Sequence, residues 1–231
     1  MRVERPLFAW SADCLPARQS SPRMRDGRSG ESKGPEARMA EVRPIIPTDF
    51  AYTRTAIALH WVTVALIATG FTIGVWMVDL PIAPQTIRVY AYHKWIGITV
   101  FLVTLARVAW RAAHPVPPAA AMPSWQRRAA IASHVSLYVL MLAIPMSGWL
   151  YSSATGVEVV YLGVIPLPNV VAKDEALAAL LKSVHYTLNF TLLALVLVHA
   201  GAALRHHYVE RDRVLSRMLP AMPARNEESA R

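Results

Sequence analysis

The stretch that decides the fold is SVHYTLNFTLLALVLVHAGAALRHH, residues 183–207. Its apolar run is about 20 residues long, which is enough for one helix to cross a bilayer. His185 and His199 lie 14 positions apart in it. Fourteen steps of about 100° return almost to the starting angle, so both imidazoles leave the same face of the helix, separated by roughly 21 Å along its axis. One therefore lies near each edge of the hydrocarbon layer.

Histidines at these two depths indicate a function. Ionisable residues inside a membrane span are costly and usually functional, and imidazole is the commonest metal ligand among side chains. His185 and His199 therefore suggest two stacked haems, each with one axial ligand from this helix. The alternative is a pair of histidines that hydrogen-bond to neighbouring helices.

Four stretches of the chain can span a membrane, at about 55–78, 90–111, 129–152 and 183–205. Of the 231 residues, 54% are hydrophobic. We expect one all-α domain over residues 47–220, an integral membrane four-helix bundle with up-and-down connections. Residues 1–46, rich in Arg, Ser, Pro and Gly, read as a disordered tail with Met39 as an alternative start, and residues 221–231 as a C-terminal tail.

The basic residues predict the orientation. Of the 24 Lys and Arg residues, 20 lie before the first span, in the second connection or after the last span. The two other connections hold only Arg88, Lys94, Lys173 and Lys182. By the positive-inside rule, both termini face the cytoplasm. We therefore expect a multi-pass membrane protein, with lipid and no nucleic acid as a partner.

Cysteine usage excludes several kinds of site. The single cysteine, Cys14, lies in the polar tail. An internal disulfide, a cysteine-ligated iron–sulfur cluster and a covalently attached c-type haem are therefore excluded.

A polar pattern repeats at matched depth on all four spans. The level near the cytoplasm carries His60, Arg107, His134 and His199, and the periplasmic level carries Gly74, His93, Gly148 and His185. Each helix contributes one residue to each level, 14 positions apart. A glycine removes a side chain where a flat macrocycle must approach the backbone, although small residues also mediate close helix packing in membranes. The pattern predicts two non-covalent haem b groups.

The segments IALHW, YHKWIG and SHVSLYVLMLAIPMSGWLY resemble the prokaryotic cytochrome b561 family, as does LKSVHYTLNFTLLALVLVHAGAALRHHYVERDRVLSRMLP. The resemblance covers about residues 50–220, and the HHY followed by a basic stretch and MLP is especially characteristic. The b-type subunits of respiratory hydrogenases and formate dehydrogenases look more distantly similar.

The resemblance also implies ligands and a quinone site. His93 and His185 would hold the periplasmic haem, and His60 and His199 the cytoplasmic haem. Geometry alone leaves His134 open as the ligand opposite His199. By resemblance, His134 and His206 instead line a ubiquinone site. Arg107 would pair with a haem propionate or a quinone oxygen, or else extend to the membrane surface and contribute only to topology.

The resemblance extends to the superoxide oxidases of this family, which are linked to ubiquinone. It implies a protein of the bacterial inner membrane and electron transfer between a periplasmic donor, superoxide above all, and the quinone pool. Bis-imidazole ligation leaves the iron no open position and therefore favours electron transfer over oxygen binding. The alternative function is that of a membrane anchor and electron-transfer subunit for a separate dehydrogenase or hydrogenase. The apolar connection 156–168 is expected to lie on the bundle.

Overall fold

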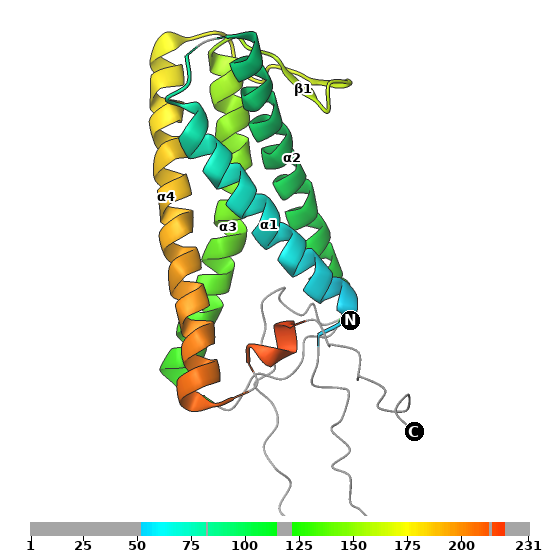
Figure 1. Cartoon of the computed structure of the whole chain (residues 1–231), viewed down its shortest axis with the longest axis vertical. Coiled ribbons are helices and arrows are strands. Elements are labelled where there is room, and N and C mark those ends of the chain that lie inside the picture. The colour runs from blue at the N-terminus through cyan, green and yellow to red at the C-terminus, as the bar shows by residue number, and fades with distance from the viewer. Residues whose placement is uncertain (1–51, 82, 115–121, 213, 220–231) are drawn as a thin grey trace, which may run out of the picture.

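The computed structural model describes residues 52–81, 83–114, 122–212 and 214–219. Within these residues the chain forms four long helices: α1 (Arg54–Met77), α2 (Pro84–Ala113), α3 (Ser124–Ala154) and α4 (Glu175–Arg205). They run alternately up and down, which confirms the all-α four-helix bundle expected from the sequence (Figure 1). The expected tails, residues 1–46 and 221–231, lie outside the described residues.

Local capping chemistry explains where three of the helices begin. The hydroxyl of Thr53 accepts a hydrogen bond from the Ala56 amide at the start of α1. Pro84 stands in the first turn of α2, where its missing N–H costs nothing. The Asp174 carboxylate accepts from the Leu177 amide, 2.9 Å away, and caps α4. Because of this cap, α4 begins at Glu175 and not near residue 183, where the apolar run begins.

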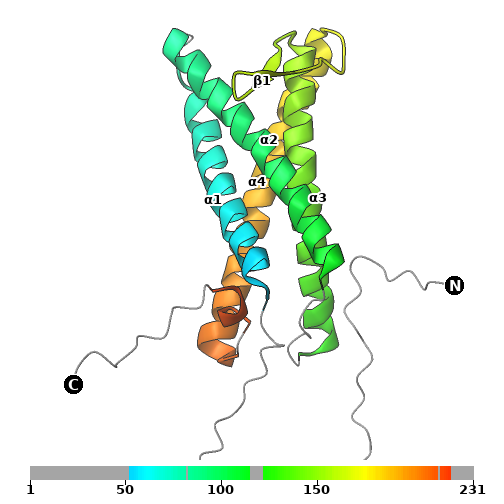
Figure 2. The same ribbon diagram turned by 90° about the vertical axis from the view of Figure 1, so that its right-hand side faces the viewer.

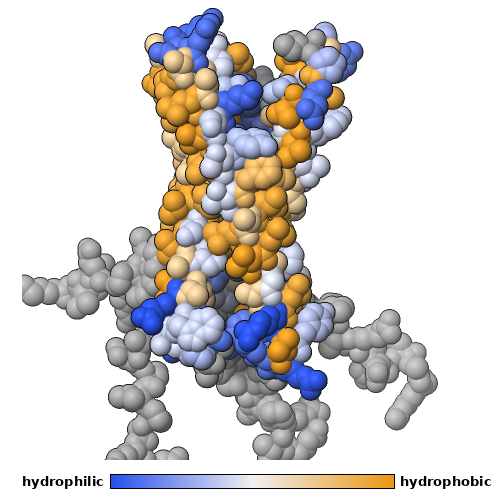
Figure 3. All heavy atoms as spheres, turned by 90° about the vertical axis from the view of Figure 1, so that its left-hand side faces the viewer, coloured by the Kyte–Doolittle hydropathy of each residue, from blue (hydrophilic) through white to orange (hydrophobic). Residues whose placement is uncertain are grey.

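The surface of the bundle is that of a membrane protein. All four helices are long and apolar enough to cross a bilayer. On the face that Figure 3 shows, apolar side chains prevail in the middle of the bundle and hydrophilic side chains gather at both ends. Since hydrocarbon surrounds such a band in a bilayer, the outward apolar side chains need no protein partner.

The helices pack as two pairs. α1 packs on α2 and α3 on α4, while α2 also packs on α3. At the upper end in Figure 2, the α1–α2 pair diverges from the α3–α4 pair. Between the two ends, Leu140, Ile144 and Leu192 form a buried cluster, with Ile67 of α1 packed against it. This cluster joins the two pairs at mid-membrane depth.

Short elements follow the long helices near the two ends of the bundle. At the upper end, β1 (Val159–Tyr161) and β2 (Ile165–Leu167) form an antiparallel hairpin. At the lower end, α4 continues into the π-helix η3 (His206–Glu210), and the chain returns toward α1 in the 3-10 helix η4 (Ser216–Met218). The Trp61 indole donates a hydrogen bond of 2.7 Å to the carbonyl of Met218, which ties this return to α1.

We predict that Leu192→Ala destabilises the protein in detergent by on the order of 1–2 kcal/mol. Lipid is as apolar as leucine, so the loss comes from the cavity left among Leu140, Ile144 and Leu192. Leu197→Ala on the same helix is the matched control, because Leu197 is 63% exposed toward lipid whereas Leu192 is 5% exposed. Thermal unfolding of both variants checks this, and equal midpoints for the two would contradict it.

Candidate functional site

The upper level of the bundle brings His93 of α2 and His185 of α4 together. Their ring centroids are 6.2 Å apart and the rings are nearly perpendicular. His93 Nδ1 lies 3.0 Å from the carbonyl oxygen of Gly70. His185 Nδ1 lies 3.1 Å from the carbonyl oxygen of Ile144 and 3.0 Å from the Ser147 hydroxyl. A carbonyl only accepts, so each Nδ1 carries the proton and each Nε2 keeps its lone pair.

A glycine backs each of these imidazoles. A Cβ atom placed on Gly74 would lie 2.9 Å from Cε1 of His93. A Cβ placed on Gly148 would lie 3.0 Å from Cε1 of His185. The separation at Gly74 is shorter than side chains tolerate, and the one at Gly148 would require the His185 ring to shift by a few tenths of an ångström. The two glycines of the repeated pattern therefore make room for the two histidine rings, which is a more specific role than general helix packing.

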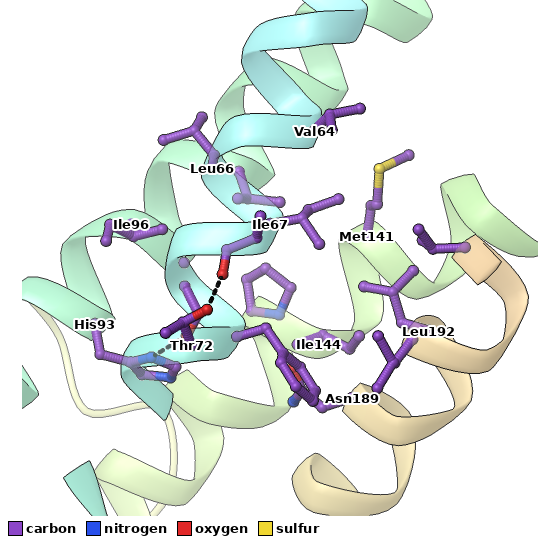
Figure 4. A pocket seen from close by; sticks show the side chains of 18 of the residues that line it. Val64, Leu66, Ile67, Thr72, His93, Ile96, Met141, Ile144, Asn189 and Leu192 are labelled. Carbon is purple, nitrogen blue, oxygen red and sulfur yellow. Dashed lines mark hydrogen bonds between the residues drawn. The ribbon is translucent and has the colours of Figure 1, made fainter. Parts of the chain in front are cut away.

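A cavity of about 360 Å³ opens beside this pair. Figure 4 shows His93 on one side of it, with Met141, Asn189 and Leu192 on the other. His185 also lines it. The rest of the lining is mostly apolar, and the Asn189 amide donates to the backbone carbonyl of His185. An apolar cavity with two imidazoles at its edge suits a flat hydrophobic ligand that binds through a metal.

These residues fit a haem held by two imidazoles. A metal–imidazole bond is about 2.0–2.1 Å long, so two such bonds and two ring radii add up to about 6 Å. The 6.2 Å between the ring centroids of His93 and His185 matches that span. Axial histidines usually donate Nδ1–H to a backbone carbonyl or carboxylate, which orients the ring. Both histidines do so here.

The lower level is arranged differently. His134 of α3 and His199 of α4 are in ring contact, with centroids 5.3 Å apart. His134 Nδ1 bonds to the carbonyl of Ala130 in its own helix, 2.6 Å away. His60 of α1 instead lies against Arg107, whose guanidinium donates to His60 Nδ1 over 3.2 Å. The four residues expected at this level therefore form two separate contacts, His134 with His199 and His60 with Arg107.

His206 lies below this level in a small polar cluster. Its Nδ1 is 2.6 Å from a carboxylate oxygen of Asp212 and 2.6 Å from one of Glu210. Glu210 also pairs with Arg205, at 2.7 Å. The His206 side chain is 16% exposed, so water still reaches the cluster. Of the residues expected to line a quinone site, His206 is thus near the bundle end, while His134 and Arg107 are at the lower level.

The sequence did not reveal three polar partners in these sites. Asp212 is six positions after His206, a spacing that no α-helix places on one face. The π-helix η3 and the left-handed backbone of Arg211 turn the chain so that Asp212 lies beside His206. Ser147 of α3 contacts His185. In the sequence, its position next to Gly148 is the feature that indicates this contact. The Arg107 guanidinium lies 5.4 Å above the ring of Tyr138, a contact that depends on how α2 and α3 pack.

Comparison with known proteins agrees with this architecture. The family model described as prokaryotic cytochrome b561 matches residues 51–221. Cytochrome b561 homolog 2 of Escherichia coli is 34% identical over 170 residues, which cover 70% of this chain and 87% of that protein. Cytochrome b561 homolog 1 of the same organism is 32% identical over 174 residues, 73% of this chain and 97% of that protein.

The name of a third relative states an enzymatic activity. The probable superoxide oxidase CybB of Yersinia pestis is 28% identical over 173 residues, which cover 73% of this chain and 96% of that protein. The family resemblance noted from the sequence motifs is confirmed, and the family implies a bound haem b and electron transfer. This bacterial membrane protein therefore belongs to the prokaryotic cytochrome b561 family.

Proposed function

We propose that this chain is a di-haem cytochrome of the bacterial inner membrane that oxidises superoxide at its periplasmic end and reduces ubiquinone near its cytoplasmic end. Two superoxide anions then yield two molecules of oxygen and two electrons. One ubiquinone takes up these electrons with two protons from the cytoplasmic side to form ubiquinol. The observation that carries the proposal is the facing pair His93 and His185, with each Nδ1 fixed on a backbone carbonyl.

In this proposal His93 and His185 hold the periplasmic haem b. Haem b, when bound, supplies one-electron redox chemistry. The Gly70 and Ile144 carbonyls orient the two rings through Nδ1 and keep Nε2 available for the iron. Ser147 provides a further hydrogen-bonding partner for His185. The mostly apolar lining of the cavity suits the hydrophobic body of a haem.

For the cytoplasmic haem b, two ligand pairs compete. Resemblance to the family favours His60 with His199, because His60 stands in the matching segment IALHW. The ring contact between His134 and His199 favours the other pair, and so does the anchored Nδ1 of His134. With His60 as the ligand through Nε2, its Nδ1 would have to leave Arg107 and take up the proton, or Nε2 would have to give up the proton that it carries while Nδ1 accepts from Arg107. We retain His60 and His199 as the proposed pair.

His134, His206 and Arg107 are proposed to serve ubiquinone. The Asp212 and Glu210 carboxylates hold the Nδ1–H of His206, so Nε2 is the atom that would exchange a proton with a quinone oxygen. Arg107 offers charged donors that would bind a quinone oxygen or a haem propionate. Its present partner is His60, with Tyr138 under the guanidinium.

Superoxide as the donor rests on the name of the Yersinia pestis relative. The formal charge on the periplasmic side is balanced, with Asp79, Glu158, Asp174 and Glu175 against Arg88, Lys94, Lys173 and Lys182. Attraction of the anion must therefore be local. Lys94 follows the proposed ligand His93, and the exposed Lys182 lies three positions before His185.

We predict two haem b groups per chain and the loss of one in His93→Ala and in His185→Ala. Either change leaves the periplasmic iron with a single protein ligand. The pyridine haemochrome assay and the reduced spectrum measure this. His114→Ala is the matched control: its ring stacks on Trp110 outside both levels, so both haems should remain. Two full haem equivalents in both ligand variants would contradict the pairing.

For the cytoplasmic haem, we predict that His60→Ala and His199→Ala lose it. His134→Ala should keep two haems and slow ubiquinone reduction instead, since only a proton or hydrogen bond is removed. The same spectra, together with quinol formation rates, decide between the two pairs. Loss of haem in His134→Ala with retention in His60→Ala would make His134 and His199 the ligands.

We predict that superoxide reduces the haems rapidly, and that added ubiquinone reoxidises them. The rate should fall with ionic strength because screening weakens attraction of the anion. Lys94→Gln and Lys182→Gln should each lower the rate at low salt by about twofold, as expected for one charge roughly 10 Å away in water. Stopped-flow spectroscopy measures this. A negligible rate would instead favour an electron-transfer subunit of a separate dehydrogenase.

A further inference from the structure

The hairpin between α3 and α4 is unusually apolar for a connection outside the bundle. Its residues 159–168, VVYLGVIPLP, contain no charged side chain. Val164 is 78% exposed, Leu162 55% and Ile165 53%. An apolar patch of this kind on a protein surface marks contact with another protein, a ligand or a membrane.

The hairpin lies beside the bundle and not above it. Figures 1 and 2 show it projecting sideways past α2, below the upper tips of the helices. The Trp95 indole donates a hydrogen bond of 2.7 Å to the carbonyl of Val160. The hydroxyls of Thr99 and Tyr161 are 3.1 Å apart. Trp95 is 11 residues into α2, about 16 Å along its axis. Both contacts fall within the apolar run of α2, residues 90–111, which is expected to span the membrane.

The turn carries a leucine where the backbone disfavours it. Leu162 has a φ of +53° and Gly163 a φ of +74°, so both central residues of the turn are left-handed. Glycine or asparagine adopts that conformation readily, whereas other side chains lose roughly 1–2 kcal/mol there. Leu162 is also 55% exposed, so packing within the described residues covers less than half of it. Contact with an apolar environment outside the protein would offset it.

Backbone hydrogen bonding limits how deep the hairpin can lie. The outer edges of two strands carry polar groups that hydrocarbon cannot satisfy. Here the Val160 and Pro168 carbonyls accept bonds from the indoles of Trp95 and Trp149, and Pro166 has no N–H to satisfy. The edge is therefore partly satisfied by the protein. This suits the boundary between headgroups and acyl chains, which retains some water.

We propose that the turn of this hairpin, with Leu162, Val164 and Ile165, inserts into the outer leaflet of the bilayer. The flank of a membrane-spanning helix is surrounded by lipid, and the hairpin projects from such a flank, beside the apolar run of α2. The inserted hairpin braces the part of α2 that carries His93, because Trp95 lies two residues further on. It also leaves the upper end of the bundle uncovered. This inference does not depend on the electron donor or the quinone.

The test places a fluorophore at the turn. In a Cys14→Ser background, which removes the single native cysteine, Val164→Cys is labelled with a polarity-sensitive dye and the haem-loaded protein is placed in phosphatidylcholine nanodiscs. We expect blue-shifted emission, quenching by doxyl-labelled lipid and protection from aqueous iodide. Ala172→Cys is the matched control, an exposed position between the hairpin and α4 that should show the opposite pattern.

Two outcomes would overturn the proposal. Iodide quenching at position 164 as strong as at 172 would place the turn in water. Protection at 164 from both quenchers would mean that protein, either a second copy or another chain, covers the turn. A further variant, Leu162→Asn, suits the left-handed backbone and removes the apolar side chain. It should keep its haem spectrum while iodide quenching at 164 rises, and an unchanged pattern would remove Leu162 from the proposed contact.

Discussion

The interaction on which the upper site depends is the hydrogen bond from an imidazole Nδ1 to a main-chain carbonyl of the neighbouring helix. His93 bonds to Gly70 of α1, and His185 to Ile144 of α3. An imidazole N–H without a hydrogen-bond acceptor is costly inside a membrane. The position of the carbonyl therefore sets the orientation of the ring. Each bond also joins the two helices of one pair. The same contact thus fixes the tautomer, the ring orientation and the packing of the bundle.

The glycines and the cavity follow from that arrangement. Once each ring is held on a carbonyl, it occupies the space that a Cβ on Gly74 or Gly148 would need. The two pairs of helices are then held together chiefly by the cluster around Leu140 and Leu192 at mid-membrane depth, and a cavity remains between them. At the lower level, Arg107 competes for the imidazole of His60, which is why the two levels differ although their spacing in sequence is the same.

Both ends of the bundle are shaped by segments that leave the regular helices. The π-helix η3 and the left-handed Arg211 return Asp212 to His206 at the lower end. At the upper end, the hairpin is held by the indoles of Trp95 and Trp149 and directs its apolar turn away from the bundle. At the upper end the indoles satisfy carbonyl groups of the hairpin backbone, whereas at the lower end the Asp212 carboxylate bonds to the imidazole of His206.

The sequence by itself determined the four spans, the family and the matched depth of the histidines, because helix length, hydropathy and a spacing of 14 residues are properties of each helix alone. The confirmed four-helix fold follows from them. At the upper level the sequence offers only His93 and His185 as a histidine pair. At the lower level tertiary structure decided which residues meet, since rotation about each helix axis is set by packing between helices. It also decided the contact of His134 with His199, the return of Asp212 and the position of the hairpin, because each depends on residues distant in sequence or on irregular backbone.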